Sequence, residues 1–392
     1  MKKLRIFIVI LLIVALAIVC YLVFDKIQSD KNANNHVEQK ANEILNVIDD
    51  KNEEDDDDKL ALTKDITVVP TMQDDITADS AWCATFQLVW NEMKDEVVRQ
   101  DVVFEPQLDM AENLNKEEFT KDMISDEYYY LNWGLKSLKL KKEIEKGIKE
   151  KFNQKSDILE LFDWSEEELN DESDPDNNRY FFYTMLYRKF EFPKVFDVLD
   201  NDDFGDDYSD VEYFGIDDSS NSKLYEQVRV LYYNSKSDFA IKLLTKSGDE
   251  VIVAKGANGR NFAEIYENIN VASEQYDGDM FFNDNDRFKM PKLDFNVLRE
   301  YKELANKKFY DAEGNACEIA KAMQSIKFSI NEVGGEIKSE AAIDTKAVAD
   351  AEDENQEPRY CYVDDEFTIF LKEEDRDVPY FAARVTDISK YQ

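Results

Sequence analysis

The strongest alternation of apolar and polar positions lies between residues 335 and 348. Small or apolar side chains alternate one by one with mostly charged side chains, which places the two kinds on opposite faces of an extended chain. The first face carries Gly335, Ile337, Ser339, Ala341, Ile343, Thr345 and Ala347, and the second carries Glu336, Lys338, Glu340, Ala342, Asp344, Lys346 and Val348. This period of two predicts a half-buried strand.

An acidic stretch follows the predicted strand at residues 347–360. It reads AVADAEDENQEPRY, has no apolar period and contains Pro358 near its end, so it predicts an exposed loop. A strand that leads straight into a long loop is compatible with two structures. One is an ordinary strand with its connection, and the other is a segment that inserts at the edge of a sheet.

Other strands and helices follow from the same kind of pattern. Predicted strands cover residues 181–187, 227–233, 239–244, 250–254, 361–371 and 378–385. Three helices are predicted by apolar side chains at helical spacing. The first helix is capped by Asp79 or Ser80 and carries the apolar residues Trp82, Phe86, Val89 and Met93. The second covers residues 131–152, is basic, and continues in 158–169. The third is capped by Asp294 and carries Val297, Leu298, Tyr301 and Leu304.

The N-terminus carries a separate apolar segment. Residues 6–24 are 19 apolar residues without a charge, preceded by Lys2, Lys3 and Arg5. A helix of that length comes close to the roughly 30 Å thickness of the hydrocarbon core of a membrane. We expect residues 1–25 to be a single-pass anchor in the cell membrane, with the N-terminus cytoplasmic and the rest of the chain extracellular. A cleaved signal peptide, processed near residues 15–17, is the alternative.

A polar linker and a folded domain follow the anchor. Residues 26–71 are polar and include an acidic run at 53–58, which is typical of a solvated spacer; a cation site or a processing site is the alternative. Residues 72–392 form the predicted domain, because 43% of the 392 residues are hydrophobic and 12% aromatic. With 48 basic and 86 acidic residues the formal net charge is −38, which disfavours binding to nucleic acid.

The residues needed for common catalytic sites are missing from the predicted domain. The single histidine, His36, lies in the linker, so the domain has no Ser-His-Asp or Cys-His arrangement and no zinc spacing. Residues 200–210 resemble a calcium loop, but Phe204 and Val211 stand where oxygen ligands are required. We therefore predict no enzyme and no cofactor. Outside the anchor, Cys83, Cys317 and Cys361 allow one disulfide but are expected to be buried thiols.

The start of the alternating strand resembles the hinge of the serpins. Residues 331–336 read NEVGGE and lead into a run rich in Ala and Ser, where the family has Asn-Glu-Glu-Gly-Thr-Glu followed by alanines. Residues 361–371 and 378–385 resemble the family's C-terminal strand pair, with Val363, Asp364, Phe367, Phe381, Arg384 and Val385 in agreement. Residues 184–196 resemble a central serpin strand through Tyr187, Lys189 and Phe196, and 290–292 resemble its Leu-Pro-Lys. The resemblance runs intermittently from residue 80 to 387.

This resemblance implies an α+β fold with a large central mixed β-sheet, smaller sheets, surrounding helices and an exposed reactive-centre-like loop. It implies a suicide inhibitor of an extracellular serine or cysteine protease, in which the cleaved loop inserts as a new strand. The implied hinge residues are Glu332, Gly334, Gly335, Glu336, Ile337, Ser339 and Ala341, and the region that gates sheet opening would contain Ser80, Cys83, Thr184 and Gln324. Counting from Glu332 places the scissile bond at Val348-Ala349, with Arg359 as the alternative.

The residues at the implied scissile bond indicate the class of target. A small apolar residue suits an elastase-like or subtilisin-like protease, whereas Arg359 would suit a trypsin-like one. The domain is expected to be a monomer. Several departures from the family pattern bear on insertion: Ile337 is bulky where alanine is preferred, Gly335 replaces threonine, and Thr184 and Gln324 replace an asparagine and a histidine. Two alternatives to a protease inhibitor are a surface-anchored binding module without protease trapping and a structural envelope protein.

Overall fold

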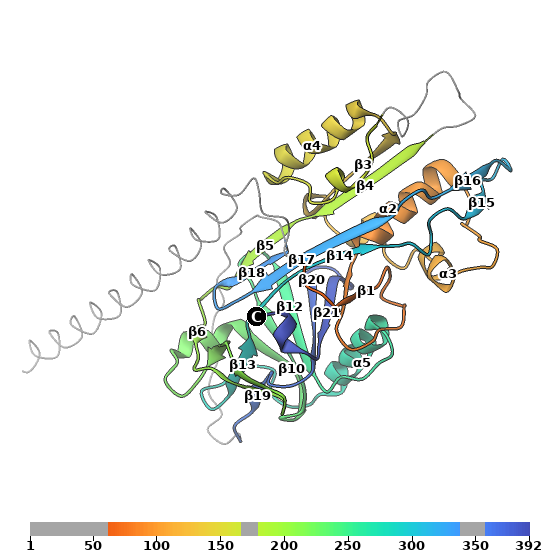
Figure 1. Cartoon of the computed structure of the whole chain (residues 1–392). Coiled ribbons are helices and arrows are strands. Elements are labelled where there is room, and N and C mark those ends of the chain that lie inside the picture. The colour runs from red at the N-terminus through yellow and green to blue at the C-terminus, as the bar shows by residue number, and fades with distance from the viewer. Residues whose placement is uncertain (1–61, 166–178, 338–356) are drawn as a thin grey trace, which may run out of the picture. The chain divides into compact units, whose positions relative to one another are not determined.

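The computed structural model describes residues 62–165, 179–337 and 357–392, which belong to one compact unit, Leu60–Gln392 (Figure 1). Within these ranges no helix combines the length and apolar character needed to cross a membrane. The predicted anchor at residues 1–25 lies outside the described part of the chain. The strand β1 (Thr67–Val68) lies inside the predicted linker, so the folded unit begins before residue 72.

The largest sheet has seven strands in the order β1-β2-β21-β20-β12-β11-β10. Every residue of β12 and β20 is buried, as expected for strands covered on both faces. These strands confirm the sequence predictions for 227–254 and for 378–385, whereas the predicted strand 361–371 is divided between β19 (Tyr360–Tyr362), which lies in a second sheet, and β20 in this one. Their bounds are β2 Ser80–Cys83, β10 Val228–Ser235, β11 Asp238–Leu244, β12 Asp249–Lys255, β20 Phe367–Glu373 and β21 Pro379–Val385.

A second sheet of four strands follows the order β19-β13-β9-β6. Its strand β13 pairs in parallel with β19, the first strand after the undescribed residues 338–356. The bounds are β6 Asp197–Val198, β9 Tyr213–Ile216, β13 Arg287–Pro291 and β19 Tyr360–Tyr362. Two small hairpins accompany the sheets: β7 (Asp202–Phe204) with β8 (Tyr208–Val211), and β15 (Lys308–Tyr310) with β16 (Ala316–Glu318).

The remaining strands form two walls joined at one end. One wall is the pair β3 (Tyr129–Leu135) and β4 (Tyr180–Leu186), which β5 (Arg188–Glu191) continues after Tyr187. The other wall is the pair β14 (Leu293–Glu300) and β17 (Met323–Ile330). The short strand β18 (Gly334–Ile337) pairs with both β17 and β5 and so joins the walls at one end.

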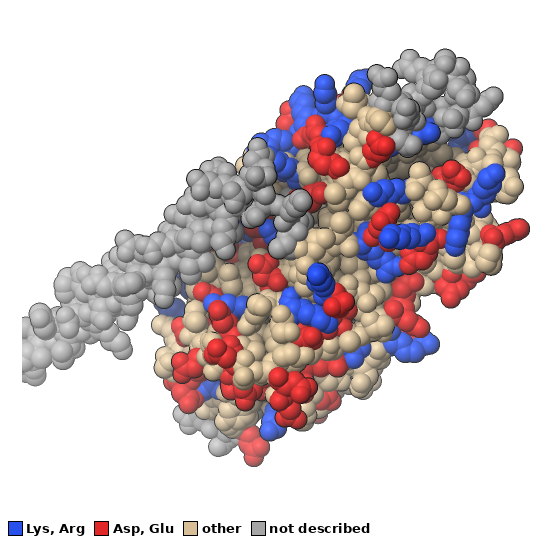
Figure 2. All heavy atoms as spheres, in the orientation of Figure 1, with Lys and Arg blue, Asp and Glu red and all other residues tan. Residues whose placement is uncertain are grey.

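Four α-helices pack around these sheets in the described part of the chain. Helix α2 (Thr85–Met93) packs against β4 and is followed by a π-helical turn, Lys94–Val98; α3 is Asp109–Asn115 and α5 is Phe262–Gln275. Helix α4 (Leu138–Phe152) buries Leu140, Ile144 and Ile148 in a cluster with Phe181 and Tyr183 of β4. Its polar side carries lysines, and blue side chains gather over it in Figure 2. The short 3-10 helices are Lys121–Met123, Asp126–Tyr128, Leu159–Leu161, Ser222–Gln227 and Ile388–Lys390.

Three helix predictions from the sequence are wrong in part. The segment after Asp294 is strand β14, because the alternate residues Leu293, Phe295 and Val297 are buried and pair with β17. Period two therefore overrides the apparent helical spacing of Val297 and Leu298. The first predicted helix begins only at Thr85 and follows strand β2, and the second begins at Leu138 after strand β3. Residues 158–165 contain a single 3-10 turn.

The C-terminus is tied to the seven-stranded sheet by one buried carboxylate. Asp79 accepts hydrogen bonds from the backbone N–H groups of Thr386 (2.8 Å) and Asp387 (3.1 Å) and from the Lys390 ammonium (2.8 Å). Burial alone raises the pKa of Asp79, but these hydrogen bonds outweigh it and hold the pKa below its usual value. The ionised carboxylate thus stabilises the folded state.

Replacing Asp79 with Asn should destabilise the domain near neutral pH and have little effect in acid. Because the folded-state pKa is depressed, the stabilisation is present above the unfolded pKa and is lost as the pH falls through the folded value. We expect a difference of about 2 kcal/mol between wild type and Asp79→Asn at pH 7, shrinking below about pH 4. Urea unfolding at several pH values measures it, with Asp75→Asn, an exposed aspartate, as the control. A difference that does not change with pH would contradict the assignment.

Candidate functional site: a slot between two strand walls

Strand β18 enters between the two walls as a short antiparallel insertion. Gly335 lies opposite Ile330 of β17 on one side and opposite Phe190 of β5 on the other. The two glycines permit a close approach to these neighbours. A Cβ at Gly334 would lie 2.1 Å from the carbonyl oxygen of Phe190, and a Cβ at Gly335 would lie 2.7 Å from that of Ser329. Gly335, which weakens an isolated strand, is therefore required here by packing.

A tight turn and an ion pair hold the start of β18. Asn331 N–H donates to the carbonyl of Gly334 (2.8 Å), and its side-chain oxygen accepts from Val333 N–H (2.9 Å). Glu332 is 6% exposed, and its carboxylate lies 3.2 Å from the Lys292 ammonium. The carbonyl of Glu332 also accepts from Phe196 N–H (2.9 Å). Glu332, a predicted hinge residue, therefore forms an ion pair with Lys292, which follows β13, and a backbone hydrogen bond with Phe196, which follows β5.

The tip of β18 lies over a buried charged cluster. Ile337 pairs with Arg188, whose Nε donates to Asp249 (2.7 Å) and whose guanidinium lies 3.9 Å from the ring centroid of Tyr128. Tyr380 donates its hydroxyl to the other oxygen of Asp249 (2.9 Å). Burial lowers the pKa of Arg188, but the Asp249 carboxylate outweighs it and raises the pKa. This cluster fixes β5, and with it one wall, to the seven-stranded sheet.

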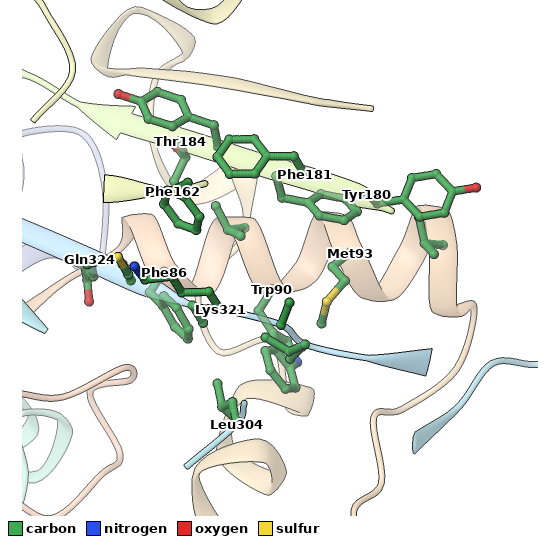
Figure 3. A pocket seen from close by; sticks show the side chains of 18 of the residues that line it. Phe86, Trp90, Met93, Phe162, Tyr180, Phe181, Thr184, Leu304, Lys321 and Gln324 are labelled. Atoms are coloured by element: carbon green, nitrogen blue, oxygen red, sulfur yellow. The ribbon is translucent and has the colours of Figure 1, made fainter. Parts of the chain in front are cut away.

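Beyond Ile337 the two walls separate around a cavity of about 1320 Å³. Strand β4 lines one side, residues 316–327 line the other, and α2 contributes Phe86, Trp90 and Met93 (Figure 3). Among the described residues, β4 pairs only with β3, and β17 is paired toward β18 only at Ser329 and Ile330. Two strand edges therefore face the cavity with no described strand between them. We call this cavity the slot.

Three of the four residues assigned to gating line the slot. Gln324 donates to the carbonyl of Cys83 (3.0 Å) and to the Thr85 hydroxyl (2.9 Å), and it accepts from the Tyr301 hydroxyl (2.7 Å). Thr184 lies on the opposite wall, and its hydroxyl is buried without a hydrogen-bond partner. Ser80 lies in β2, where its hydroxyl donates to Thr77 O (3.4 Å), and it does not line the slot.

Other assigned residues fall outside the described chain or are buried. Ser339, Ala341, Val348 and Ala349 lie within residues 338–356, which the structure does not describe. Of the three cysteines, Cys83 and Cys361 are buried free thiols as predicted, whereas Cys317 is only half-buried. Burial is the main cause that raises the pKa of each thiol.

Arg359 is a correction to the sequence prediction. Its side chain is 5% exposed, and its guanidinium donates to both carboxylate oxygens of Asp286, at 3.1 and 2.6 Å, and to the carbonyl of Phe281 (2.6 Å). The Asp286 carboxylate outweighs burial and raises the pKa of Arg359 above its usual range. A protease cannot take this side chain into its specificity pocket without breaking a buried ion pair, so Arg359 is a structural residue rather than an alternative cleavage site.

Two features of the slot were missed by sequence reasoning. Arg188 directly follows the largely apolar run 180–187 and lies beside the slot rather than in its lining, and an arginine at the end of such a run signals a buried ion pair. Phe162 and Lys321 also line the slot, but they are 159 positions apart and carry no shared sequence signal. Only the packing of the chain brings them together.

Comparison with known proteins gives weak structural likeness alone. No protein-family model matches this chain, and no curated protein matches it. Similar solved structures include Serpin48 from the insect Tenebrio molitor, with 15% identity over 80% of this chain and 92% of that one and a TM-score of 0.43. Native Tengpin, a thermophilic serpin, has 12% identity over 80% and 90% and a TM-score of 0.42. Human thyroxine-binding globulin complexed with thyroxine has 14% identity over 68% and 77% and a TM-score of 0.38.

The first two of these structures carry the name serpin. All three TM-scores are below 0.5, so no argument about the fold or function of this chain rests on the likeness. The described residues themselves form a mixed α/β fold with a large multi-stranded sheet and few helices. The fold prediction is confirmed to that extent. No protease target, cleavage site or cellular location follows from this likeness.

Proposed function

We propose that this chain is a divergent serpin that inhibits a protease by offering residues 338–356 for cleavage and then taking the cleaved segment into the slot as a strand. One observation carries the proposal. Strand β18 already pairs with β5 at four residues and with β17 at two, and it points along a slot whose edges have no described strand between them. A chain that continues this strand would complete both rows of backbone hydrogen bonds.

The register of β18 predicts where each following residue would lie after insertion. Ile337 pairs with Arg188, so an uninterrupted strand would place Ala341 opposite Thr184. On the other side Glu336 pairs with Ser329, so the same residue would lie opposite Gln324. The two gating positions on the opposing walls would thus meet across Ala341, which is small enough to fit between them.

The same register predicts which face of the inserted strand turns inward. Cross-strand partners point to the same side of a sheet, and Phe328 and Ile326 of β17 are buried on the side of the main core. Ile337 is on that side and only 3% exposed, so the bulky side chain that appeared unfavourable in the sequence is accommodated. Ser339 and Ala341 would follow Ile337 on the inner face, while the charged side chains of Lys338 and Glu340 would lie on the outer face.

The cleavage site and the cellular location are part of the proposal. We keep Val348-Ala349 as the scissile bond and an elastase-like or subtilisin-like enzyme as the target. Residues 1–25 would anchor the domain to the outer surface of the cell membrane through the acidic linker. The protein itself would act without catalytic chemistry, because the reactive species is the acyl-enzyme formed by the target.

Incubation of the protein with elastase, and in parallel with trypsin, tests this function. We expect elastase to form a complex that survives denaturing gel electrophoresis, because insertion would trap the ester between loop and enzyme. Mass spectrometry of the released C-terminal fragment should show that it begins at Ala349. Cleavage by elastase without any stable complex would refute trapping and favour a surface-anchored binding module on the same scaffold.

A further inference from the structure

The turn before β13 exposes two large apolar side chains. Phe281 is 63% exposed, more than any other large apolar residue in the described ranges, and Met280 beside it is 50% exposed. Tyr360, the first residue of β19, is 43% exposed and follows Arg359, whose guanidinium donates to the carbonyl of Phe281 (2.6 Å). We call Met280, Phe281 and Tyr360 the apolar patch. Aromatic residues and Met are the types that are enriched at the centre of protein interfaces.

The backbone of this turn is fixed although its side chains are exposed. Val230 N–H donates to the carbonyl of Met280 (2.9 Å), and Arg229 pairs with Phe281 in an isolated β-bridge. The guanidinium carbon of Arg229 lies 4.9 Å from the ring centroid of Phe281 and restricts the ring. Scattered exposed apolar residues need no explanation, but two adjacent ones on a fixed turn do. A ring that is already ordered loses little conformational entropy when a partner covers it.

The apolar patch lies where the chain returns from residues 338–356. Glu357 and Pro358 are exposed, and the next residue is the buried Arg359 that donates to Phe281 O. Residue 357 follows the proposed cleavage position, Ala349, by eight residues, which span at most about 29 Å when fully extended. A globular protease of about 230 residues is roughly 45 Å across. An enzyme bound at Ala349 is therefore wide enough to contact the surface beside residue 357.

The charge around the apolar patch is acidic. Exposed acidic residues on the segments that carry the patch or bond to it are Glu226, Asp277, Asp279, Asp284 and Glu357. The neighbouring cation, Arg229, directs its guanidinium to the carbonyls of Glu226 (2.8 Å) and Val228 (2.9 Å). A complementary partner surface therefore has an apolar depression surrounded by Lys or Arg.

We propose that the apolar patch is a docking surface for the target protease, separate from the loop that enters the active site of that protease. The protease places an apolar depression over Met280 and Phe281, and basic side chains over the acidic rim, while residues 348–349 occupy its active site. Two linked contacts strengthen the complex that forms before cleavage, and they select among proteases that share a preference for a small apolar residue. This inference rests on the proposed function, since it concerns recognition of the same protease.

Binding of a protease that cannot cleave the loop tests the docking surface separately from trapping. The probes are elastase and subtilisin, each with its catalytic serine replaced by alanine, and the dissociation constant is measured by biolayer interferometry. For the enzyme that binds wild type more tightly, we expect Phe281→Ala and Met280→Ala each to weaken binding about tenfold, as for a central interface side chain. Tyr310→Ala, at a residue 58% exposed on the β15 hairpin, is the matched control and should bind like wild type.

Two further measurements accompany the dissociation constants. Binding of wild type should weaken as sodium chloride is raised to about 0.5 M, because salt screens the acidic rim. The melting temperatures of all three variants should equal that of wild type, because the truncated side chains are exposed. A loss of binding in a variant that melts normally is then a loss of contact with the protease.

The outcomes separate docking from trapping. Equal affinity of wild type and Phe281→Ala would overturn the docking surface even if active elastase forms a stable complex on a denaturing gel. Weaker binding of Phe281→Ala without any such complex from wild type would support docking and refute trapping. Failure of both inactive enzymes to bind wild type would overturn the docking surface. A wild-type dimer in light scattering that becomes a monomer in Phe281→Ala would assign the apolar patch to a second copy of the chain instead.

Discussion

Cleavage within residues 338–356 should raise the melting temperature of the domain by roughly 10 °C or more. An inserted strand would give backbone partners to the facing edges of β4 and β17 and would place small side chains over α2. Each new hydrogen bond contributes about 1 kcal/mol, and a domain of this size gains about 2 °C per kcal/mol. Calorimetry of intact and elastase-cleaved protein measures the change.

Two arginine substitutions make this result specific to insertion. By the register of β18, Ala341→Arg would place a long charged side chain on the inner face between Thr184 and Gln324, where burial of an unpaired charge is costly. The cleaved variant should melt at nearly the same temperature as the intact one. Glu340→Arg changes a neighbouring residue on the outer face that is already long and charged, so its cleaved form should gain as much as wild type.

The outcomes separate the proposed functions. A rise in wild type and Glu340→Arg that is lost in Ala341→Arg is the result expected for strand insertion. A cleaved wild type whose melting temperature stays unchanged would show that the slot takes no strand, and would leave the protein as a binding module. An equal rise in both arginine variants would show that the register of β18 does not continue beyond Ile337.

Replacement of Arg188 by Met should destabilise the intact domain by about 3–5 kcal/mol, the usual cost of removing one partner of a buried ion pair. Arg188 is 1% exposed and Asp249 is 1% exposed, so the remaining carboxylate would be left buried without its counter-charge. The tip of β18 lies opposite Arg188, so the hinge should loosen as well. Urea unfolding measures the free-energy change, and hydrogen exchange of residues 334–337 measures the loosening.

The matched control is Arg384→Met, at a partly exposed ion pair with Glu366 in the seven-stranded sheet. Surface pairs contribute about 0–1 kcal/mol, so this variant should remain close to wild type. Adding Asp249→Leu to Arg188→Met should restore part of the lost stability, because the unpaired carboxylate is then gone. A loss below 1 kcal/mol in Arg188→Met would contradict the anchoring role assigned to this cluster.

Strands were predicted more successfully than helices, for a physical reason. Fully buried strands such as β12 and β20 have a mostly apolar centre with charged residues at one or both ends, and the prediction of such a centre needs no knowledge of the neighbouring chain. The segment of β14 was misassigned because Val297, Leu298, Tyr301 and Leu304 also fit a helical period. The partner strand β17 decides between the two, since Leu293, Phe295 and Val297 lie opposite Ile330, Phe328 and Ile326.

In the candidate site, too, local features could be predicted from the sequence and contacts between distant residues could not. The sequence by itself predicted the strand character of residues 335–337 and the neighbouring strand at 181–187, because period two and apolar runs are local properties of the chain. Only the tertiary structure decided that Arg359 is buried against Asp286, that Arg188 anchors β5, and that Lys321 donates to the carbonyl of Leu161 beside the slot. Each of these three contacts joins residues that are distant in the sequence and meet only in the folded protein, either in its low-dielectric interior or across the slot. The local pattern of side chains does not indicate which distant residue will be the partner.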